Sequence, residues 1–453
     1  MSGSERLDWV KIGVIGVMCM AQTFPYYLVN STVPTLFRAE GLELTDFWAF
    51  SILTVPAWAK FLWAPYVDRH GWTKFGRRKS WILVCTLLGA VSVWALVLTT
   101  PSQDALAIVV AVLFIHMMIM ATQDIAVDAY TLENLTEKER GAGSAFKVFA
   151  EAIGEAMALG GLMFVYTSLV FPGTGSGWIT MVLIAGLALI LFTTPVILRA
   201  EPPMSEEIEA RRKAGDNPRL SKFILRPDTP PIVVLLFVGG FINFMLPPLA
   251  GPLLVDYDFS LLEVGLILGI VTPIGAPLGA IVGGALITRF GLKVVLICIA
   301  LAAIAVGTLA VTTVLNAFQV PDAFGSVSQQ VERIFSGWDG GPRVIYAITI
   351  FTPVVCIIAM LHMVFTVSRM GWASRTQAGT DFTLHGACYN IGRTFAVALS
   401  PFIAAGFGWP VYLIVLIALI SGLCIAYWAL VDRLDAICDR RRVSEGELIL
   451  EPT

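Results

Sequence analysis

Residues 292–316 read LKVVLICIALAAIAVGTLAVTTVLN, a stretch with no charged side chain after Lys293. A helix needs about 20 mainly apolar residues to cross the hydrocarbon core of a bilayer. The chain contains twelve stretches of this kind, near 10–33, 45–67, 81–100, 104–127, 144–170, 179–198, 231–255, 261–288, 292–316, 343–368, 380–406 and 409–431. The sequence therefore predicts an all-α polytopic membrane protein with twelve transmembrane helices.

Composition excludes several other classes of protein. Of the 453 residues, 57% are hydrophobic and only 14% are charged, against about 25% charged in soluble domains. The net charge of −3 gives no support for nucleic-acid binding. The seven cysteines show no C-x-x-C spacing, and no G-x-x-x-x-G-K-[ST] phosphate loop occurs. We therefore expect no metal site, no cofactor and no disulfide framework.

The basic residues predict the orientation of the chain. Most of the 30 Lys and Arg residues fall in segments that lie inside if the N-terminus is cytoplasmic, whereas the outside loops hold only Arg38, Arg333 and Arg343. This asymmetry places both termini in the cytoplasm. The charged segment 199–230 acts as a cytoplasmic linker between two six-helix bundles, 1–198 and 231–432, and 433–453 is a cytoplasmic tail.

Two short matches indicate an internal repeat. The second stretch ends in Asp68-Arg-His-Gly71 and the eighth in Thr288-Arg-Phe-Gly291, 220 residues later. Ala152-Ile-Gly-Glu155 in the fifth stretch likewise matches Asn390-Ile-Gly-Arg393 in the eleventh. Because both matches agree with the order of the predicted helices, they favour two pseudo-symmetric bundles made by duplication.

The loop after the second stretch carries a family resemblance. Asp68-Arg-His-Gly-Trp-Thr-Lys-Phe-Gly-Arg-Arg-Lys79 resembles the cytoplasmic signature of the major facilitator superfamily, roughly G-x-x-x-D-R-x-G-R-R, with Ala64 in place of the first glycine and an insertion at 72–75. A carboxylate beside arginines can form a latch that closes in one conformation and opens in another. We expect this cytoplasmic latch to consist of Asp68, Arg69, Arg77 and Arg78; anchoring by positive charge alone is the alternative.

A second resemblance covers most of the chain and concerns a subfamily. Residues 59–69 (AKFLWAPYVDR), 121–128 (ATQDIAVD) and 140–143 (RGAG) resemble the subfamily that includes muropeptide permeases, acetyl-CoA transporters and bacterial siderophore importers. Residues 378–384 (AGTDFTL) are most similar to the siderophore-importing branch. The chain departs from the permease branches in the fifth helix, where it has Glu151-Ala-Ile-Gly-Glu155 in place of Tyr-Arg.

Charged residues inside a membrane are costly unless they are paired or wetted, so each is a candidate functional residue. Lys60 is expected to pair with a carboxylate such as Asp124 or to attract an anionic solute; snorkelling or structural pairing is the alternative. Asp124 and Asp128 lie one turn apart and could share a proton. A structural salt bridge from either aspartate to Lys60 or Arg140 is equally compatible with the spacing.

The fifth stretch carries Lys147, Glu151 and Glu155 at intervals of four residues, which places them on one helix face. Lys147 is expected to pair with Glu151. The repeat makes Glu155 equivalent to Arg393, and the family resemblance implies that both helices line a central cavity. We hypothesise a gate in which protonation of Glu155 releases Arg393 to bind an anionic solute; a structural bridge is the alternative.

Two further groups complete the candidate residues. Asp381 near the start of the eleventh stretch caps that helix or forms a proton site with His385 one turn on. Prolines at 25 and 34 bound part of the first helix, and Pro247, Pro248 and Pro252 interrupt the seventh. Because broken helices at equivalent positions line cavities, we expect solute contacts from Tyr26, Tyr27 and Asn30.

These observations predict a secondary active transporter that works by alternating access. The resemblance implies proton-coupled import of a bulky polar solute through a bacterial inner membrane: a siderophore first, and a muropeptide in cell-wall recycling as the alternative. The partners are then the solute, protons and the lipid bilayer. A membrane-embedded enzyme acting on lipid-linked substrates is the alternative from another class. The internal repeat favours a transporter, so no enzymatic activity is expected.

Overall fold

The computed structural model describes residues 8–71, 76–135, 139–170, 176–198, 226–321, 341–373 and 378–444. These ranges are almost entirely helical and contain no strand. Ten helical segments within them are long and apolar enough to cross a membrane. The prediction of an all-α polytopic membrane protein is therefore confirmed.

Most predicted spans coincide with observed helices to within a few residues. In the first half of the chain the helices are α1 (Trp9–Tyr27), α2 (Val33–Ala39), α5 (Arg77–Trp94), α6 (Leu106–Asn134), α7 (Arg140–Ala156), α8 (Leu162–Ser168) and α9 (Gly177–Thr193). In the second half they are α12 (Thr229–Asn243), α13 (Ala250–Asp256), α14 (Leu261–Phe290), α15 (Leu292–Leu315), α17 (Gly341–Trp372) and α18 (Ala378–Ser444). The last helix is continued well beyond its predicted end at 431.

The second predicted span, 45–67, is not one regular helix. It consists of the 3₁₀ segment η2 (Leu44–Thr54), α3 (Val55–Ala59), the 3₁₀ segment η3 (Lys60–Leu62) and α4 (Ala64–Arg69). Pro56 and Pro65 lack the backbone N–H that continues an α-helical ladder, so each favours a new start. The span is thus present but broken.

The eleventh and twelfth spans are joined in α18 and separated by Gly408. This glycine has φ 78° and ψ 164°, a conformation that interrupts the helix and that residues with a Cβ rarely adopt. Gly408 divides one of the ten long segments into two helices, and the broken second span is not among the ten. Together they bring the count to the twelve helices that the sequence predicts.

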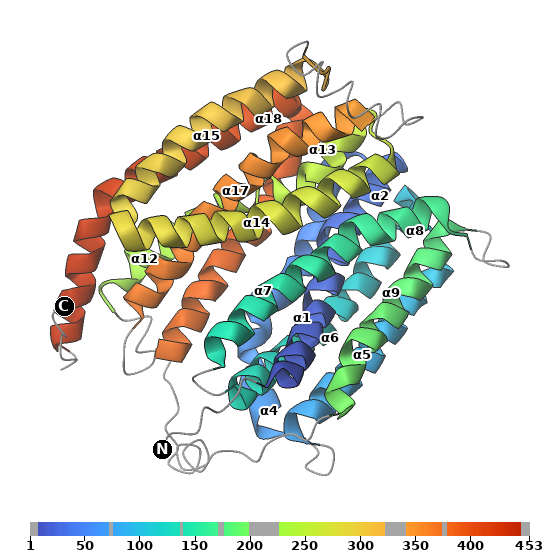
Figure 1. Cartoon of the computed structure of the whole chain (residues 1–453), viewed down its shortest axis with the longest axis horizontal. Helices are drawn as coiled ribbons and strands as arrows, with labels where there is room; N and C mark the ends of the chain where they lie inside the picture. The colour runs from blue at the N-terminus through green and yellow to red at the C-terminus, as the bar shows by residue number, and fades with distance from the viewer. Residues whose placement is uncertain are drawn as a thin grey trace. The chain divides into compact units, whose positions relative to one another are not determined.

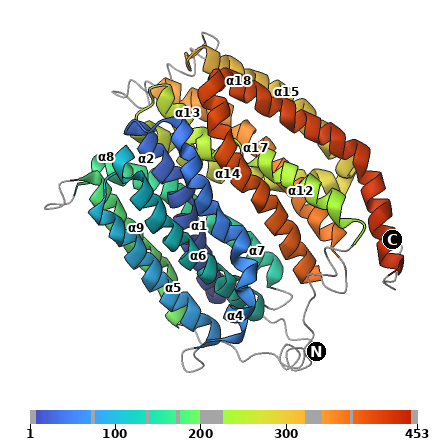
Figure 2. The same ribbon diagram turned by 180° about the vertical axis from the view of Figure 1, so that it is seen from behind.

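The described residues fall into two compact units. The first contains those of 1–43, 59–210 and 250–273, and the second those of 44–58, 211–249 and 274–453. In the first unit α1 packs on α7, and α5 packs on α6 and α9 (Figure 1). In the second, α18 packs on α12, α15 and η2, as the view from behind also shows for α15 and α18 (Figure 2). The division into bundles 1–198 and 231–432 follows chain order and stays a prediction.

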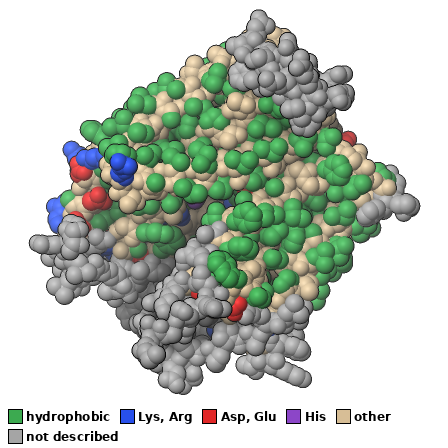
Figure 3. Space-filling view, viewed as in Figure 1, with side chains coloured by type: hydrophobic (Ala, Val, Ile, Leu, Met, Phe, Trp, Pro, Cys, Tyr) green, Lys and Arg blue, Asp and Glu red, His purple; other side chains and the backbone are tan. Residues whose placement is uncertain are grey.

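The surface of the helices is apolar, as lipid requires. Leu301 and Ile281, for example, are 63% and 69% exposed. Figure 3 shows hydrophobic side chains over most of the face in view, with the coloured charged side chains near its edges. Since lipid tails solvate apolar groups, this exposure is compatible with a membrane and not with water.

Candidate functional site

A cluster of charged side chains joins α6 and α7 in the first unit. The Lys60 ammonium donates to Asp124 on α6. Lys147 on α7 lies 3.3 Å from Asp128 Oδ1 and 3.8 Å from Glu151 Oε1. The predicted pairs Lys60–Asp124 and Lys147–Glu151 are confirmed, whereas Asp128 pairs with Lys147 and the side chain of Arg140 lies outside the described part of the chain.

This cluster remains accessible and carries an excess of negative charge. Lys60 and Asp124 are 28% and 31% exposed, and the other three side chains are similarly open. Three carboxylates face two ammonium groups, so ionisation of all five leaves one negative charge over. A partly wetted cluster of this kind can exchange a proton or attract a cationic group of a solute.

Glu155 lies deeper along the same face of α7. Its side chain is 5% exposed. One carboxylate oxygen accepts a hydrogen bond from the Tyr27 hydroxyl, and Oε1 has no hydrogen-bond partner. A buried polar atom without a partner is unusual in a folded protein and points to a function.

Two π-helical segments adjoin Glu155 and Tyr27. The segment η1 (Leu28–Thr32) begins directly after Tyr27, and η7 (Met157–Gly161) begins two residues after Glu155. The Thr32 hydroxyl donates a 2.7 Å hydrogen bond to the Ala158 carbonyl oxygen and so joins the two segments. Single-turn π-segments inside α-helices often mark functional sites.

Tyr26 and Asn30, predicted to contact solute, lie beside this site. The Asn30 amide donates 2.8 Å to the Tyr26 carbonyl oxygen of its own helix. The rings of Tyr26 and Tyr27 meet edge to face, 5.2 Å apart. Of these three residues Tyr27 contacts Glu155, whereas Tyr26 contacts Asn30 and the Tyr27 ring on the same helix; a role of all three in binding stays a prediction.

Glycines explain why the repeat matches fall where they do. A Cβ built on Gly154 of α7 would lie 3.3 Å from Met20 Cα of α1. A Cβ built on Gly392 of α18 would lie 2.0 Å from the Phe237 carbonyl oxygen of α12. In both halves of the chain, glycine thus permits a close helix crossing immediately before the charged residue, Glu155 or Arg393.

Arg393 belongs to the second unit. Its side chain is buried, and its guanidinium lies 5.0 Å from the centre of the Phe244 ring. Glu155 belongs to the first unit. The gate between Glu155 and Arg393 stays a prediction.

Asp381 forms part of a buried group of charges in the second unit. It lies in the first turn of α18, is fully buried and accepts from Arg226. Arg441 Nη1 lies 3.8 Å from Asp381 and 3.4 Å from Asp228. His385, the proposed partner of Asp381, donates a hydrogen bond to the backbone carbonyl oxygen of Arg369. Arg226, Asp228 and Arg441 lie in the segments predicted as linker and tail, so this group was not predicted.

The cytoplasmic latch is only partly visible. The side chains of Asp68 and Arg69, and all of residues 72–75, lie outside the described residues. Arg77 and Arg78 form the first turn of α5, and Arg78 is buried. The latch therefore stays a prediction.

Polar contacts between distant parts of the chain were not predicted. Arg38 Nε of α2 donates 2.6 Å to Asp256 Oδ1 of α13 within the first unit. Within the second unit, the Thr394 hydroxyl lies 2.6 Å from that of Thr54 and accepts from Trp58 Nε1 at 3.1 Å. Such pairs join segments that are hundreds of residues apart, so spacing along the chain gives no signal for them.

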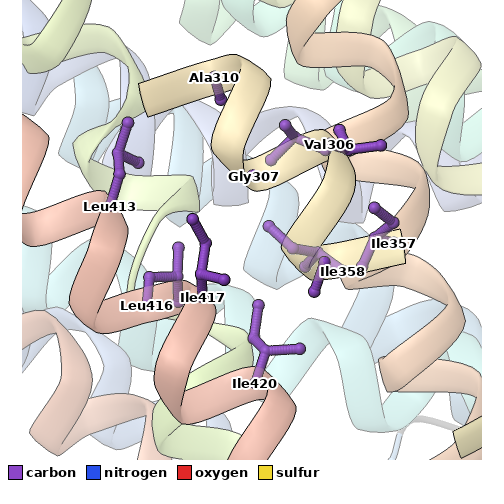
Figure 4. Close-up of a pocket in the computed structure, with 11 residues that line it drawn as sticks. Val306, Gly307, Ala310, Ile357, Ile358, Leu413, Leu416, Ile417 and Ile420 are labelled. Atoms are coloured by element: carbon purple, nitrogen blue, oxygen red, sulfur yellow. The ribbon is translucent and has the colours of Figure 1, made fainter. Parts of the chain in front are cut away.

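One pocket in the second unit is wholly apolar (Figure 4). It lies among α15, α17 and α18, and its lining includes Val306, Gly307, Ile357, Leu413, Ile417 and Ile420. No charged or hydrogen-bonding side chain reaches it. It offers nothing to orient a polar solute, in contrast to the charged clusters above.

Solved structures of transporters share this fold. The nucleoside transporter NupG (D323A mutant) aligns with a TM-score of 0.69 at 14% identity, over 93% of this chain and 99% of its own. A D-xylose-proton symporter aligns with a TM-score of 0.62, also at 14% identity, over 93% and 96%. At this identity the likeness establishes the arrangement of helices alone.

Sequence comparison identifies relatives and a family. The anhydromuropeptide permease of Escherichia coli (strain K12) is 26% identical over 288 residues, which cover 62% of this chain. The match spans 56% of the permease, little more than half of its length. The family model of the Major Facilitator Superfamily matches residues 15–328. That match covers well over half of the sequence, so the chain belongs to the Major Facilitator Superfamily.

Proposed function

We propose that this chain is a proton-coupled secondary transporter that imports a muropeptide-class solute across a bacterial inner membrane by alternating access. The superfamily assignment and the transporter folds support transport in general. The name of the E. coli relative supports the solute class. It favours the muropeptide alternative over the siderophore that the second-half resemblance put first. The excess of basic residues on one side supports cytoplasmic termini.

The observation that carries this proposal is the burial of the Glu155 carboxylate, one oxygen of which has no hydrogen-bond partner. A buried carboxylate with one unpaired oxygen is costly when ionised, and protonation removes its charge. Glu155 lies two residues before η7, and its partner Tyr27 directly precedes η1, so a change in its charge acts next to backbone that is already irregular. Binding or release of a proton there can therefore favour different helix arrangements, which is what coupling requires.

The charged cluster of the first unit supplies an entry for the proton. Lys60, Asp124, Asp128, Lys147 and Glu151 are partly exposed, whereas Glu155 is buried one turn beyond Glu151. In this proposal the cluster exchanges protons with water and Glu155 stores one during the transport cycle. Release of Arg393 on protonation of Glu155 remains part of the hypothesis.

Transport in proteoliposomes tests the function. Purified protein is reconstituted, and uptake of radiolabelled anhydromuropeptide is followed with and without an inward proton gradient, beside a labelled ferric siderophore. We expect the gradient to stimulate anhydromuropeptide uptake. Uptake of the siderophore alone would mean that the solute is a siderophore and not a muropeptide. Uptake of neither solute would contradict the proposed function.

Substitution of Glu155 tests the coupling. Glu155→Gln should lose the stimulation by the gradient but still exchange labelled for unlabelled solute, because exchange needs no net proton movement. Glu263→Gln is the matched control, since Glu263 only accepts hydrogen bonds from Ser260 at the start of α14. If Glu155→Gln responded to the gradient like the unaltered protein, Glu155 would not be the coupling residue.

The enzyme alternative has weaker support. Its active site would need a compact acid–base or metal cluster, and no group of three or more metal-ligating side chains occurs among the described residues. The relatives above are transporters by name. Chemical alteration of anhydromuropeptide by the purified protein would support the enzyme alternative.

A further inference from the structure

Arg369 in the last turn of α17 is a buried cation held between two aromatic rings. Its guanidinium lies 5.2 Å from the ring centres of both Phe382 and Tyr389 on α18. The side chain is only 8% exposed. The two rings attract the cation through their faces and restrict it to one orientation.

The guanidinium uses little of its hydrogen-bonding capacity. Nη2 donates 3.0 Å to the Thr366 hydroxyl. Nε is buried and has no partner. Arginine has five N–H donors, so this geometry leaves enough of them for a bidentate carboxylate.

No carboxylate in the described ranges neutralises Arg369. The two carboxylates buried elsewhere in the same unit, Asp228 and Asp381, form ion pairs with Arg226 and Arg441. A buried charge without a counter-ion is strongly unfavourable. The positive charge of Arg369 is therefore available to an anion that is not part of these ranges.

The guanidinium is flanked by a glycine and by two partly buried side chains. Gly386 of α18 faces it, and a Cβ built there would lie 3.5 Å from Arg369 Nη1. His362 and Thr366, on the same face of α17, are only partly buried. His362 Nδ1 lies 3.1 Å from the Tyr389 hydroxyl, which fixes the ring that supports Arg369.

We propose that Arg369 binds a carboxylate of the transported solute. The proposal rests on the proposed function, because muropeptides carry free peptide carboxylates. Phe382 and Tyr389 orient the guanidinium. Its bond to Thr366 uses one N–H of Arg369, so most of the N–H donors of Arg369 can bond to a carboxylate. Arg369 thus selects solutes with a free carboxylate over the corresponding amides.

The test compares anhydromuropeptide with its derivative in which every peptide carboxylate is a carboxamide. Binding of both to purified full-length protein is measured by isothermal titration calorimetry. For the unaltered protein we expect binding of the carboxylate form to be roughly tenfold tighter or more, as for one good charge-assisted pair. Arg369→Gln should bind both forms with similar, weak affinity, and Arg369→Lys should keep part of the preference.

Two further variants separate binding from structure. Gly386→Ala keeps the charge but places a methyl group beside Nη1, so it should weaken binding of the carboxylate form more than of the amide. Arg289→Gln is the matched control, since Arg289 is an exposed arginine at the end of α14. Arg369→Gln should melt at the same or a higher temperature than the unaltered protein, because it removes an unneutralised buried charge.

The outcomes are distinct. Binding of the carboxylate form with a preference that survives in Arg369→Gln would overturn the role of Arg369 and leave the proposed solute class standing. Marked destabilisation of both Arg369→Gln and Arg369→Lys, with the preference intact in whatever protein remains folded, would show that the arginine is structural. Binding of neither solute by the unaltered protein would overturn the proposed solute class and this inference together.

Discussion

The Thr32 hydroxyl and the Ala158 carbonyl oxygen lie 2.7 Å apart, and their hydrogen bond joins the two π-helical segments of the first unit. A π-segment leaves backbone carbonyl groups without their usual partner four residues on. Thr32 donates to a carbonyl group of η7 across the helix interface, and Asn30 of η1 donates to the Tyr26 carbonyl oxygen in the last turn of α1. The irregular backbone beside Glu155 is therefore supported on two sides.

Loss of this bond should weaken the packing of the first helix on the fifth. Thr32→Val keeps the shape of the side chain but removes the donor, so we expect a loss of about 0.5–1.5 kcal/mol in the free energy of unfolding, the usual range for such bonds inside membranes. Thr194→Val is the control, since Thr194 is exposed and bonds only to its own helix. Equal melting temperatures for the two variants would refute the role of Thr32.

The Lys60–Asp124 pair should behave as a coupled unit. Lys60→Met and Asp124→Asn should each lose about 1–3 kcal/mol of stability, because each leaves a partly buried charge unpaired, and the double variant should recover most of the loss. The control pair is Lys293–Asp432, at 40% and 75% exposure, where Lys293→Met should change stability little. Additive losses in the double variant of Lys60 and Asp124 would contradict the coupling.

Gly392 should tolerate no side chain. In Gly392→Ala the new methyl group would lie 2.0 Å from the Phe237 carbonyl oxygen, so α12 and α18 would have to separate. We expect a loss of about 3 kcal/mol or more, as for overpacked interiors. Gly422→Ala on the same helix meets nothing within 4 Å and should fold normally. Thermal unfolding of both variants in detergent measures the difference.

The Arg38–Asp256 pair should stabilise one state of the transport cycle. It joins the ends of the first and seventh helices within the first unit. Breaking it by Arg38→Glu should lower the rate of anhydromuropeptide uptake about tenfold, which corresponds to a shift of about 1.4 kcal/mol between states. Adding Asp256→Arg restores opposite charges and should restore uptake. Failure of the reversed pair to recover activity would mean that the charges do not act through each other.

Hydropathy predicted most of the fold, because lipid imposes a length and a composition on each span. Ion pairs one helical turn apart were also predictable: Lys147 and Glu151 meet as their spacing requires. The second span was predicted at 45–67, but its breaks were not, since the effect of Pro56 and Pro65 depends on packing that periodicity does not reveal. The π-segments gave no signal, because their composition does not differ from that of the adjoining α-helix.

Pairs far apart in the chain were beyond the reach of spacing. Arg226 and Asp381 are 155 residues apart, and Arg38 and Asp256 are 218 apart. Arg369 follows directly on the predicted span 343–368, and only the positions of Phe382 and Tyr389 show that it is enclosed. Sequence spacing therefore predicted contacts within one helix but not contacts between segments that are far apart in the chain.

The ion pairs of Arg441 also bear on the order in which the second unit is completed during synthesis. Asp228 precedes α12 and Asp381 begins α18, so both enter the membrane region before Arg441 has been translated. Asp381 also forms an ion pair with Arg226, which is translated before it. The last turns of α18 thus close the buried charge group only after the ribosome has passed residue 441. A chain that ends before that residue would keep two buried aspartates with one arginine fewer.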